Sequence, residues 1–200
     1  MRQITIIIFF TLTTLFSSAQ KNDKVLHLGR FVSDTLTVKN NPYRSILPSI
    51  TKSKNKVEIR FISTSFGEET FTILTYNQKW EAKSFYIPFN KDSLFSNSID
   101  QKENLNTIFS RLVSNNIFSL PDQATVITDP CTYNPETNEL IYSSMGITDG
   151  TDYCIEYKVG DYYRRYSYSN PCEYADYFPS VNELRNFANI VSIFSELTKK

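Results

Sequence analysis

The stretch that decides the fold is YCIEYKVGDYYRRYSYS, residues 153–169. Apolar and polar residues alternate on both sides of Gly160-Asp161, and this period of two indicates a β-hairpin with a two-residue turn. With that turn, Glu156 lies opposite Arg165, which is a favourable cross-strand charge pair. The charge pair supports this register of the two strands.

The register sorts the hairpin residues onto two faces. One face is aromatic and apolar, and we expect a C-terminal helix to cover it; its residues are Tyr153, Ile155, Tyr157, Val159, Tyr162, Arg164, Tyr166 and Tyr168. The other face is mixed and charged; its residues are Cys154, Glu156, Lys158, Tyr163, Arg165 and Ser167. On this second face, Tyr163 offers a ring for stacking, while Lys158 and Arg165 offer donors for a polar or anionic ligand. These three are the candidate ligand-binding residues. The alternative is that the tyrosines serve packing alone.

The rest of the chain predicts further strands and two helices. Alternation or short apolar runs indicate strands at 25–32, 35–38, 57–63, 70–76, 79–89, 124–128 and 139–144, the last forming a meander with the hairpin. Apolar residues recur at helical spacing over residues 100–118 and 180–197. Asp100 and Ser180 are the predicted N-caps, each followed three residues later by a glutamate. The pattern predicts an α+β fold, in which two amphipathic helices pack on one face of a mainly antiparallel sheet.

The first 19 residues have the pattern of a secretory signal peptide. Arg2 is followed by an apolar stretch over residues 4–16, and small residues then end at Ala19. The apolar stretch is shorter than the roughly 20 residues that span a bilayer. We therefore expect cleavage before Gln20, one α+β domain over residues 20–200, no membrane insertion of the mature chain, and a periplasmic or extracellular location.

Composition and motifs exclude several function classes. The chain has 21 basic and 21 acidic residues, so it lacks the basic excess of a nucleic-acid-binding protein. His27 is the only histidine, and no HExxH, GxxxxGK[ST] or GxGxxG motif occurs. We therefore expect no metal and no cofactor.

Two function hypotheses remain. The favoured one is a non-enzymatic binding or accessory module of the bacterial envelope or extracellular space, with an envelope protein or a polysaccharide as its partner. The alternative is a hydrolase that acts on envelope polymers through carboxylates that no motif identifies.

The cysteines Cys131, Cys154 and Cys172 are odd in number, so at least one does not pair within the chain. Export permits a disulfide. Since the hairpin returns the chain toward Cys154, the predicted pair is Cys154–Cys172. The alternative is that the cysteines are buried as small apolar side chains.

Two triplets, Asp34-Thr35-Leu36 and Asp92-Ser93-Leu94, resemble an acceptor motif for O-glycosylation in exported bacterial proteins. Thr35 and Ser93 are the residues that would carry the sugar.

Overall fold

The structure is a computed structural model, and it describes residues 47–88, 94–97, 99, 103–126, 131–142 and 145–198. Several sequence predictions lie outside these residues: the signal peptide, the strands at 25–32 and 35–38, His27, Thr35, Ser93 and the cap Asp100.

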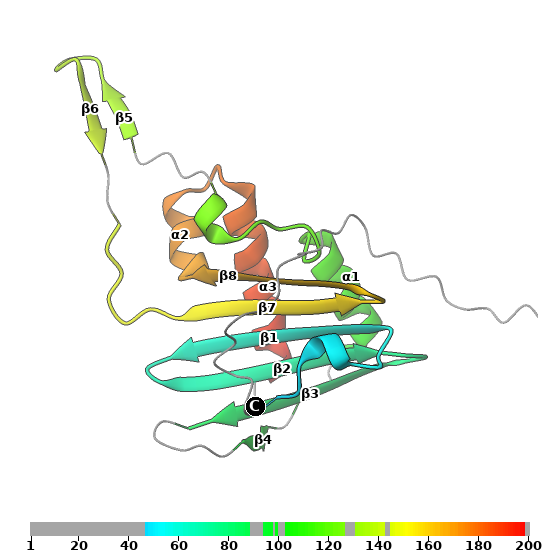
Figure 1. Cartoon of the computed structure of the whole chain (residues 1–200). Helices are drawn as coiled ribbons and strands as arrows, with labels where there is room; N and C mark the ends of the chain where they lie inside the picture. Colours follow the sequence, from blue (N-terminus) through cyan, green and yellow to red (C-terminus); the bar gives the residue numbers. More distant parts are fainter. Residues whose placement is uncertain are drawn as a thin grey trace, which may run out of the picture.

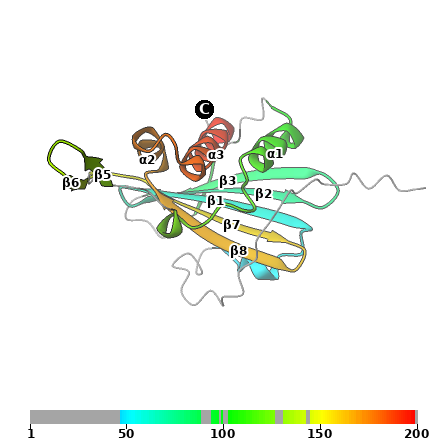
Figure 2. The ribbon, with the colours of Figure 1, turned by 90° about the horizontal axis from the view of Figure 1, so that it is seen from above.

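The described residues form an antiparallel sheet of six strands with helices on one face, so the predicted α+β class is confirmed. The strand order is β4-β3-β2-β1-β7-β8. The strands are β1 (Val57–Ser65), β2 (Glu68–Tyr76), β3 (Trp80–Ile87), β4 (Phe95–Asn97), β7 (Asp152–Val159) and β8 (Tyr162–Ser169). The helices are α1 (Leu105–Ser114), α2 (Pro171–Tyr177) and α3 (Asn182–Thr198). All three lie on the same side of the sheet (Figures 1 and 2).

The hairpin β7–β8 has the predicted register. Val159 pairs with Tyr162, and Glu156 pairs with Arg165. Strands β1, β2 and β3 follow one another as a meander, and β1 pairs with β7. The centre of the sheet therefore joins two segments that lie far apart in the sequence.

The aromatic face of the hairpin packs under the C-terminal helix, as predicted. Phe187 of α3 is fully buried, and its ring stacks on Tyr168 with the ring centroids 4.0 Å apart. The hydroxyl of Tyr157 donates to the carbonyl of Phe118 at 2.7 Å, and the hydroxyl of Tyr166 donates to the carbonyl of Ile117 at 2.6 Å. The hydroxyl of a buried tyrosine usually has such a partner. Much of the tyrosine enrichment is thus explained by packing.

Helix α1 is shorter than predicted at both ends. Its N-cap is Asn104, whose side chain accepts a hydrogen bond from the backbone of Asn106 at 2.8 Å. At its other end, Asn116 has a φ of 59°, and the Ile117 N–H donates to the Leu112 carbonyl at 3.2 Å. This is a Schellman-type end. The predicted helix ran on to residue 118 because its apolar periodicity includes Ile117, which is buried just after the helix has ended.

Other local predictions need correction. Helix α3 begins at Asn182, so Ser180 is not its N-cap. Helix α2 was not predicted; it follows Asn170, which has a φ of 50°, with Pro171 in its first turn. Residues 123–125 form a 3₁₀ helix, η3 (Gln123–Thr125), in place of a strand.

The predicted meander also needs correction, because the strand expected at 139–144 does not join the main sheet. It is β6 (Glu139–Tyr142), which pairs with β5 (Cys131–Asn134) in a separate two-stranded sheet. Figure 1 shows this hairpin extending away from the six-stranded sheet. No helix in the described part of the chain is long and apolar enough to cross a membrane.

The outer edge of β8 is covered by side chains in place of a further strand. The Asp122 carboxylate accepts a hydrogen bond from the backbone of Ser167 at 3.0 Å. The Gln123 amide binds Ser169 twice: its oxygen accepts from the backbone N–H at 2.5 Å, and its nitrogen donates to the carbonyl at 3.2 Å. An uncovered edge invites pairing with another chain. These side chains therefore protect part of the edge.

We expect Asp122→Ala to lower the free energy of unfolding by about 1–2 kcal/mol, because a charged acceptor of backbone hydrogen bonds is lost. Urea denaturation measures this change. The matched control is Asp176→Ala, at an exposed position of α2. Light scattering should also show more self-association of Asp122→Ala than of the control. Equal stability of the two variants would contradict the role given to Asp122.

Candidate functional site

The helix-free face of the sheet carries buried charges at its centre. Glu58 and Arg60 on β1 point to this face and lie opposite Lys158 and Glu156 on β7. Glu58 is 5% exposed, Arg60 4% and Glu156 2%. Charged side chains this buried are rare unless they are paired. Arg165 on β8 extends the same row of residues beyond Glu156.

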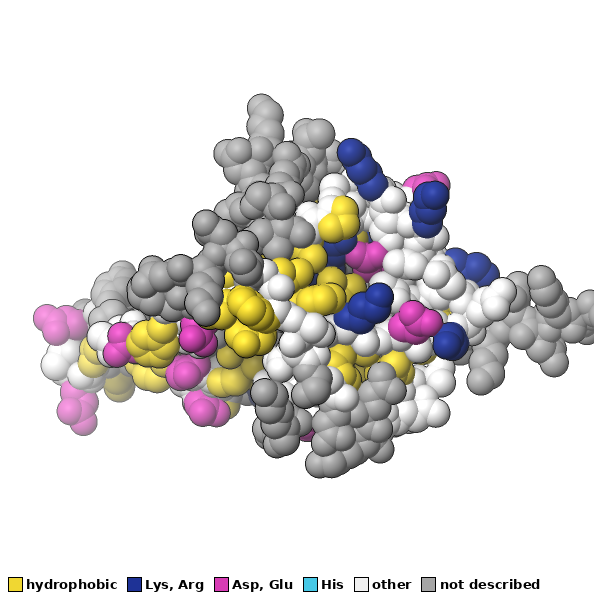
Figure 3. Space-filling view, turned by 90° about the horizontal axis from the view of Figure 1, so that it is seen from below, with side chains coloured by type: hydrophobic (Ala, Val, Ile, Leu, Met, Phe, Trp, Pro, Cys, Tyr) yellow, Lys and Arg dark blue, Asp and Glu magenta, His cyan; other side chains and the backbone are white. Residues whose placement is uncertain are grey.

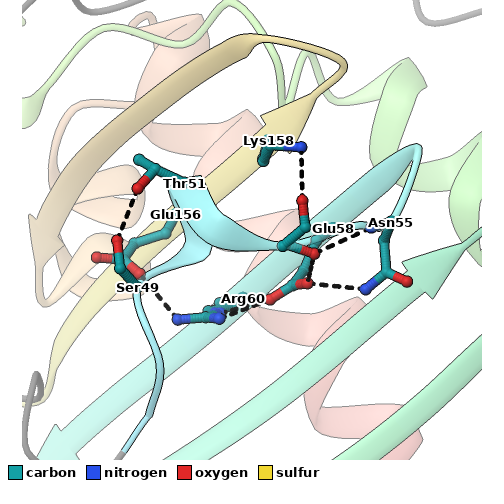
Figure 4. Close-up of polar contacts among 8 residues, drawn as sticks. Ser49, Thr51, Asn55, Glu58, Arg60, Glu156 and Lys158 are labelled. Atoms are coloured by element: carbon teal, nitrogen blue, oxygen red, sulfur yellow. Dashed lines mark hydrogen bonds and ion pairs between the residues drawn. The ribbon is translucent and has the colours of Figure 1, made fainter.

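The buried charges pair with alternating sign (Figure 4). The guanidinium of Arg60 binds the Glu58 carboxylate through Nε at 2.8 Å and Nη2 at 2.7 Å. Its Nη1 lies 3.8 Å from Oε2 of Glu156, whose Oε1 lies 4.0 Å from Nε of Arg165. Each cation thus faces at least one carboxylate across the centre of the sheet.

Residues 47–55, which include the 3₁₀ helix η2 (Ile50–Lys52), are hydrogen-bonded to charged side chains of β1 and β7. Glu58 accepts hydrogen bonds from the Ser53 hydroxyl and from the Asn55 side-chain amide, the latter at 2.9 Å. Lys158 donates to the Ser53 carbonyl at 2.9 Å. Figure 4 shows the segment running over β1.

A hollow of about 430 Å³ lies between this segment and strands β1 to β3. Its lining combines buried charge, exposed charge and apolar side chains: Leu47, Pro48, Ser49, Lys52, Ser53, Asn55, Glu58, Arg60, Ile73, Thr75, Glu81, Lys83 and Phe85. Figure 3 views the molecule from below the orientation of Figure 1, the side on which β4 lies, and shows hydrophobic side chains among Lys, Arg, Asp and Glu side chains. The volume lies within the range of small-molecule sites, about 300–1,000 Å³.

The predicted binding residues lie beside this cluster. Lys158, Tyr163 and Arg165 share the helix-free face, as the register predicted. Tyr163 is only 8% exposed, so its ring does not present an open surface for stacking. Lys158 is engaged with Ser53, and Arg165 faces Glu156. Ligand binding by these three residues stays a prediction.

Sequence reasoning did not identify Glu58 and Arg60 as site residues. The available signal was the alternation in the strand predicted at 57–63, which puts two charged residues on one face. Because β1 was not known to lie beside β7, nothing connected these charges with Glu156.

The predicted Cys154–Cys172 disulfide is absent from the structure, where both thiols are free and too far apart to bond. Cys154 is buried on the helix-free face, whereas Cys172 is exposed on α2, across the sheet. Burial raises the pKa of the Cys154 thiol to about 11, although Arg165 donates to its sulfur at 3.1 Å. This thiol therefore stays protonated at neutral pH.

We expect stability to depend on pH through Glu58. Burial alone would raise the pKa of this carboxyl, but hydrogen bonds from Ser53 and Asn55 and the charge of Arg60 lower it below 4.5. A lowered folded-state pKa adds stability above the unfolded-state pKa, and this stability is lost as the pH falls through the folded-state pKa.

The measurement is urea denaturation of the wild type and Glu58→Gln between pH 7 and pH 3. The difference in free energy of unfolding should be largest at neutral pH and should shrink below about pH 4.5. Glu81→Gln, at an exposed position of β3, is the control. A difference that stays constant with pH would contradict this assignment.

Within the described residues, no group of three or more His, Cys, Asp and Glu side chains could hold a metal ion. Comparison with known proteins gives no match: no family model, no curated protein and no solved structure is significantly similar to the chain.

Proposed function

We propose that the protein is a non-enzymatic binding module of the bacterial envelope or extracellular space, and that it binds its ligand in the hollow on the helix-free face. The observation that carries the proposal is the buried pair Glu58–Arg60 at the wall of an accessible hollow. Replacing a buried ion pair with well-packed apolar residues is often neutral or stabilising. A buried ion pair beside a hollow is therefore better explained by recognition than by stability.

The protonation state of Glu58 supports binding over acid–base hydrolysis. Glu58 accepts hydrogen bonds from three side chains and has a lowered pKa, so it holds no proton to donate at neutral pH. Glu156 lies between two cationic side chains, Arg60 and Arg165. A general acid needs a pKa near the working pH.

Blocking the hollow tests the proposal. In the variant Thr75→Trp an indole from β2 would occupy the hollow, whereas Gln78→Trp adds the same ring at an exposed turn outside it. We expect fragments found by saturation-transfer NMR against the wild type to lose binding to Thr75→Trp and to retain it with Gln78→Trp. Thermal melting verifies that both variants are folded. Fragments that bind all three proteins equally, or no fragments at all, would refute the hollow as the binding site.

Export is the second part of the proposal, and its support is the leader sequence. We expect the protein in the periplasmic or culture fraction of its native host to begin at Gln20, because Ala19 completes a signal-peptidase site. Mass spectrometry of the intact protein measures the N-terminus. A protein that retains Met1, or that is found only in the cytoplasm, would contradict export. An envelope protein or a polysaccharide remains the proposed macromolecular partner, as distinct from the ligand of the hollow.

A further inference from the structure

We infer that the ligand of the hollow is an amphipathic anion, a small molecule that joins one compact anionic group to an apolar body. This inference rests on the proposed function, because it assigns a chemical class to the ligand of the same hollow.

The charges that line the hollow favour an anion. Three cationic residues, Lys52, Arg60 and Lys83, line it against two acidic ones, Glu58 and Glu81. Both carboxylates already have partners: Glu58 binds Arg60, Ser53 and Asn55, and Glu81 lies 3.5 Å from Lys79. A cationic ligand would therefore compete with existing partners for either carboxylate.

Two of the cations are available to a ligand. Lys52 comes from η2 and Lys83 from β3, and both side chains are exposed. Within the described part of the chain, neither ammonium group makes an ion pair or a hydrogen bond. The hollow thus combines two available ammonium groups with carboxylates that already have partners.

The remaining lining favours an apolar body. Leu47, Pro48, Ile73 and Phe85 all line the hollow. Leu47 and Phe85 also pack against the buried apolar cluster of Ile62, Phe71, Ile87 and Cys154, so their positions are supported from behind. A purely polar anion would leave these apolar side chains in contact with water, whereas an acyl or aromatic body would cover them.

Three eight-carbon probes of different charge test the inference: octanoate, 1-octanol and octylamine. The measurement is NMR titration of purified full-length protein, followed through the methyl signals of Ile73 and Leu47. We expect octanoate to bind most tightly. The variant Lys52→Gln/Lys83→Gln should weaken octanoate binding at least about fivefold and leave 1-octanol binding unchanged. The control Lys54→Gln/Lys56→Gln removes the same charge from exposed positions outside the hollow, and it should change octanoate binding less than twofold.

The outcomes separate this inference from the proposed function. Preferred binding of octylamine, or equal binding of octanoate and 1-octanol, would overturn the anionic class and leave the hollow as a binding site. Equal weakening in both double variants would also overturn it, because net charge and not these two lysines would be responsible. If no eight-carbon probe binds, but the fragments that bind the wild type still fail to bind Thr75→Trp, only the inference fails. If the fragments also bind Thr75→Trp as well as they bind the wild type, the proposed function fails together with the inference.

Discussion

Replacing Arg60 with methionine is expected to lower the free energy of unfolding by about 3–5 kcal/mol at neutral pH. Methionine is apolar, unbranched and only slightly smaller in volume, so the change mainly removes the charge. Glu58 and Glu156 would then remain buried without the cation that lies between them. Urea denaturation monitored by circular dichroism measures the loss.

Matched variants distinguish lost charge from lost packing. In the triple variant Arg60→Met/Glu58→Gln/Glu156→Gln the uncompensated carboxylates are gone, so we expect more than half of the lost stability to return. Lys79→Met, at a side chain that is 82% exposed, should have almost no effect. If Arg60→Met costs less than about 1 kcal/mol, the buried pair is not the electrostatic unit described above.

Phe187→Ala is expected to cost about 3–5 kcal/mol of unfolding free energy. The Phe187 ring lies at the centre of the helix-facing core, stacked on Tyr168 and in edge contact with Tyr153 and Tyr166. Alanine would leave a cavity between α3 and the hairpin, because the surrounding rings are held by the sheet and can collapse only in part. Thermal and urea unfolding measure the loss.

The control is Phe187→Leu, which keeps most of the volume and should cost less than half as much as alanine. Because Phe187 lies on the helix-covered side of the sheet, neither variant should alter octanoate binding in the hollow. A folded Phe187→Ala protein that loses less than about 1 kcal/mol would show that α3 can repack against the hairpin.

Local chemistry in the sequence predicted the hairpin correctly. The Gly160-Asp161 turn and the pairing of Glu156 with Arg165 are both properties of residues 153–169, and the structure has the register they indicate. The helix-covered face followed from the same alternation. A hairpin needs only neighbouring residues, so a sequence can specify it without knowledge of the rest of the fold.

The candidate site could not be predicted in the same way. Its charges come from β1 and β7, and the pairing of Arg60 with Glu156 joins residues far apart in the chain. No local pattern encodes which strand lies next to which. Helix α2 was missed for a different reason: Asn170 and Pro171 indicate a turn, and they also start a seven-residue helix too short for a clear period.

The charge row across β1 and β7 also has a consequence for how the chain avoids misfolding. The native pairing puts Glu58 opposite Lys158 and Arg60 opposite Glu156. A slip of two residues would keep every side chain on its native face, so hydrophobic burial alone would barely resist it. If β1 slipped by two residues in one direction along β7, however, Arg60 would face Lys158. If it slipped in the other direction, Glu58 would face Glu156. Since like charges directly opposite destabilise a sheet, the charge row favours the native alignment of β1 with β7 over both slipped ones.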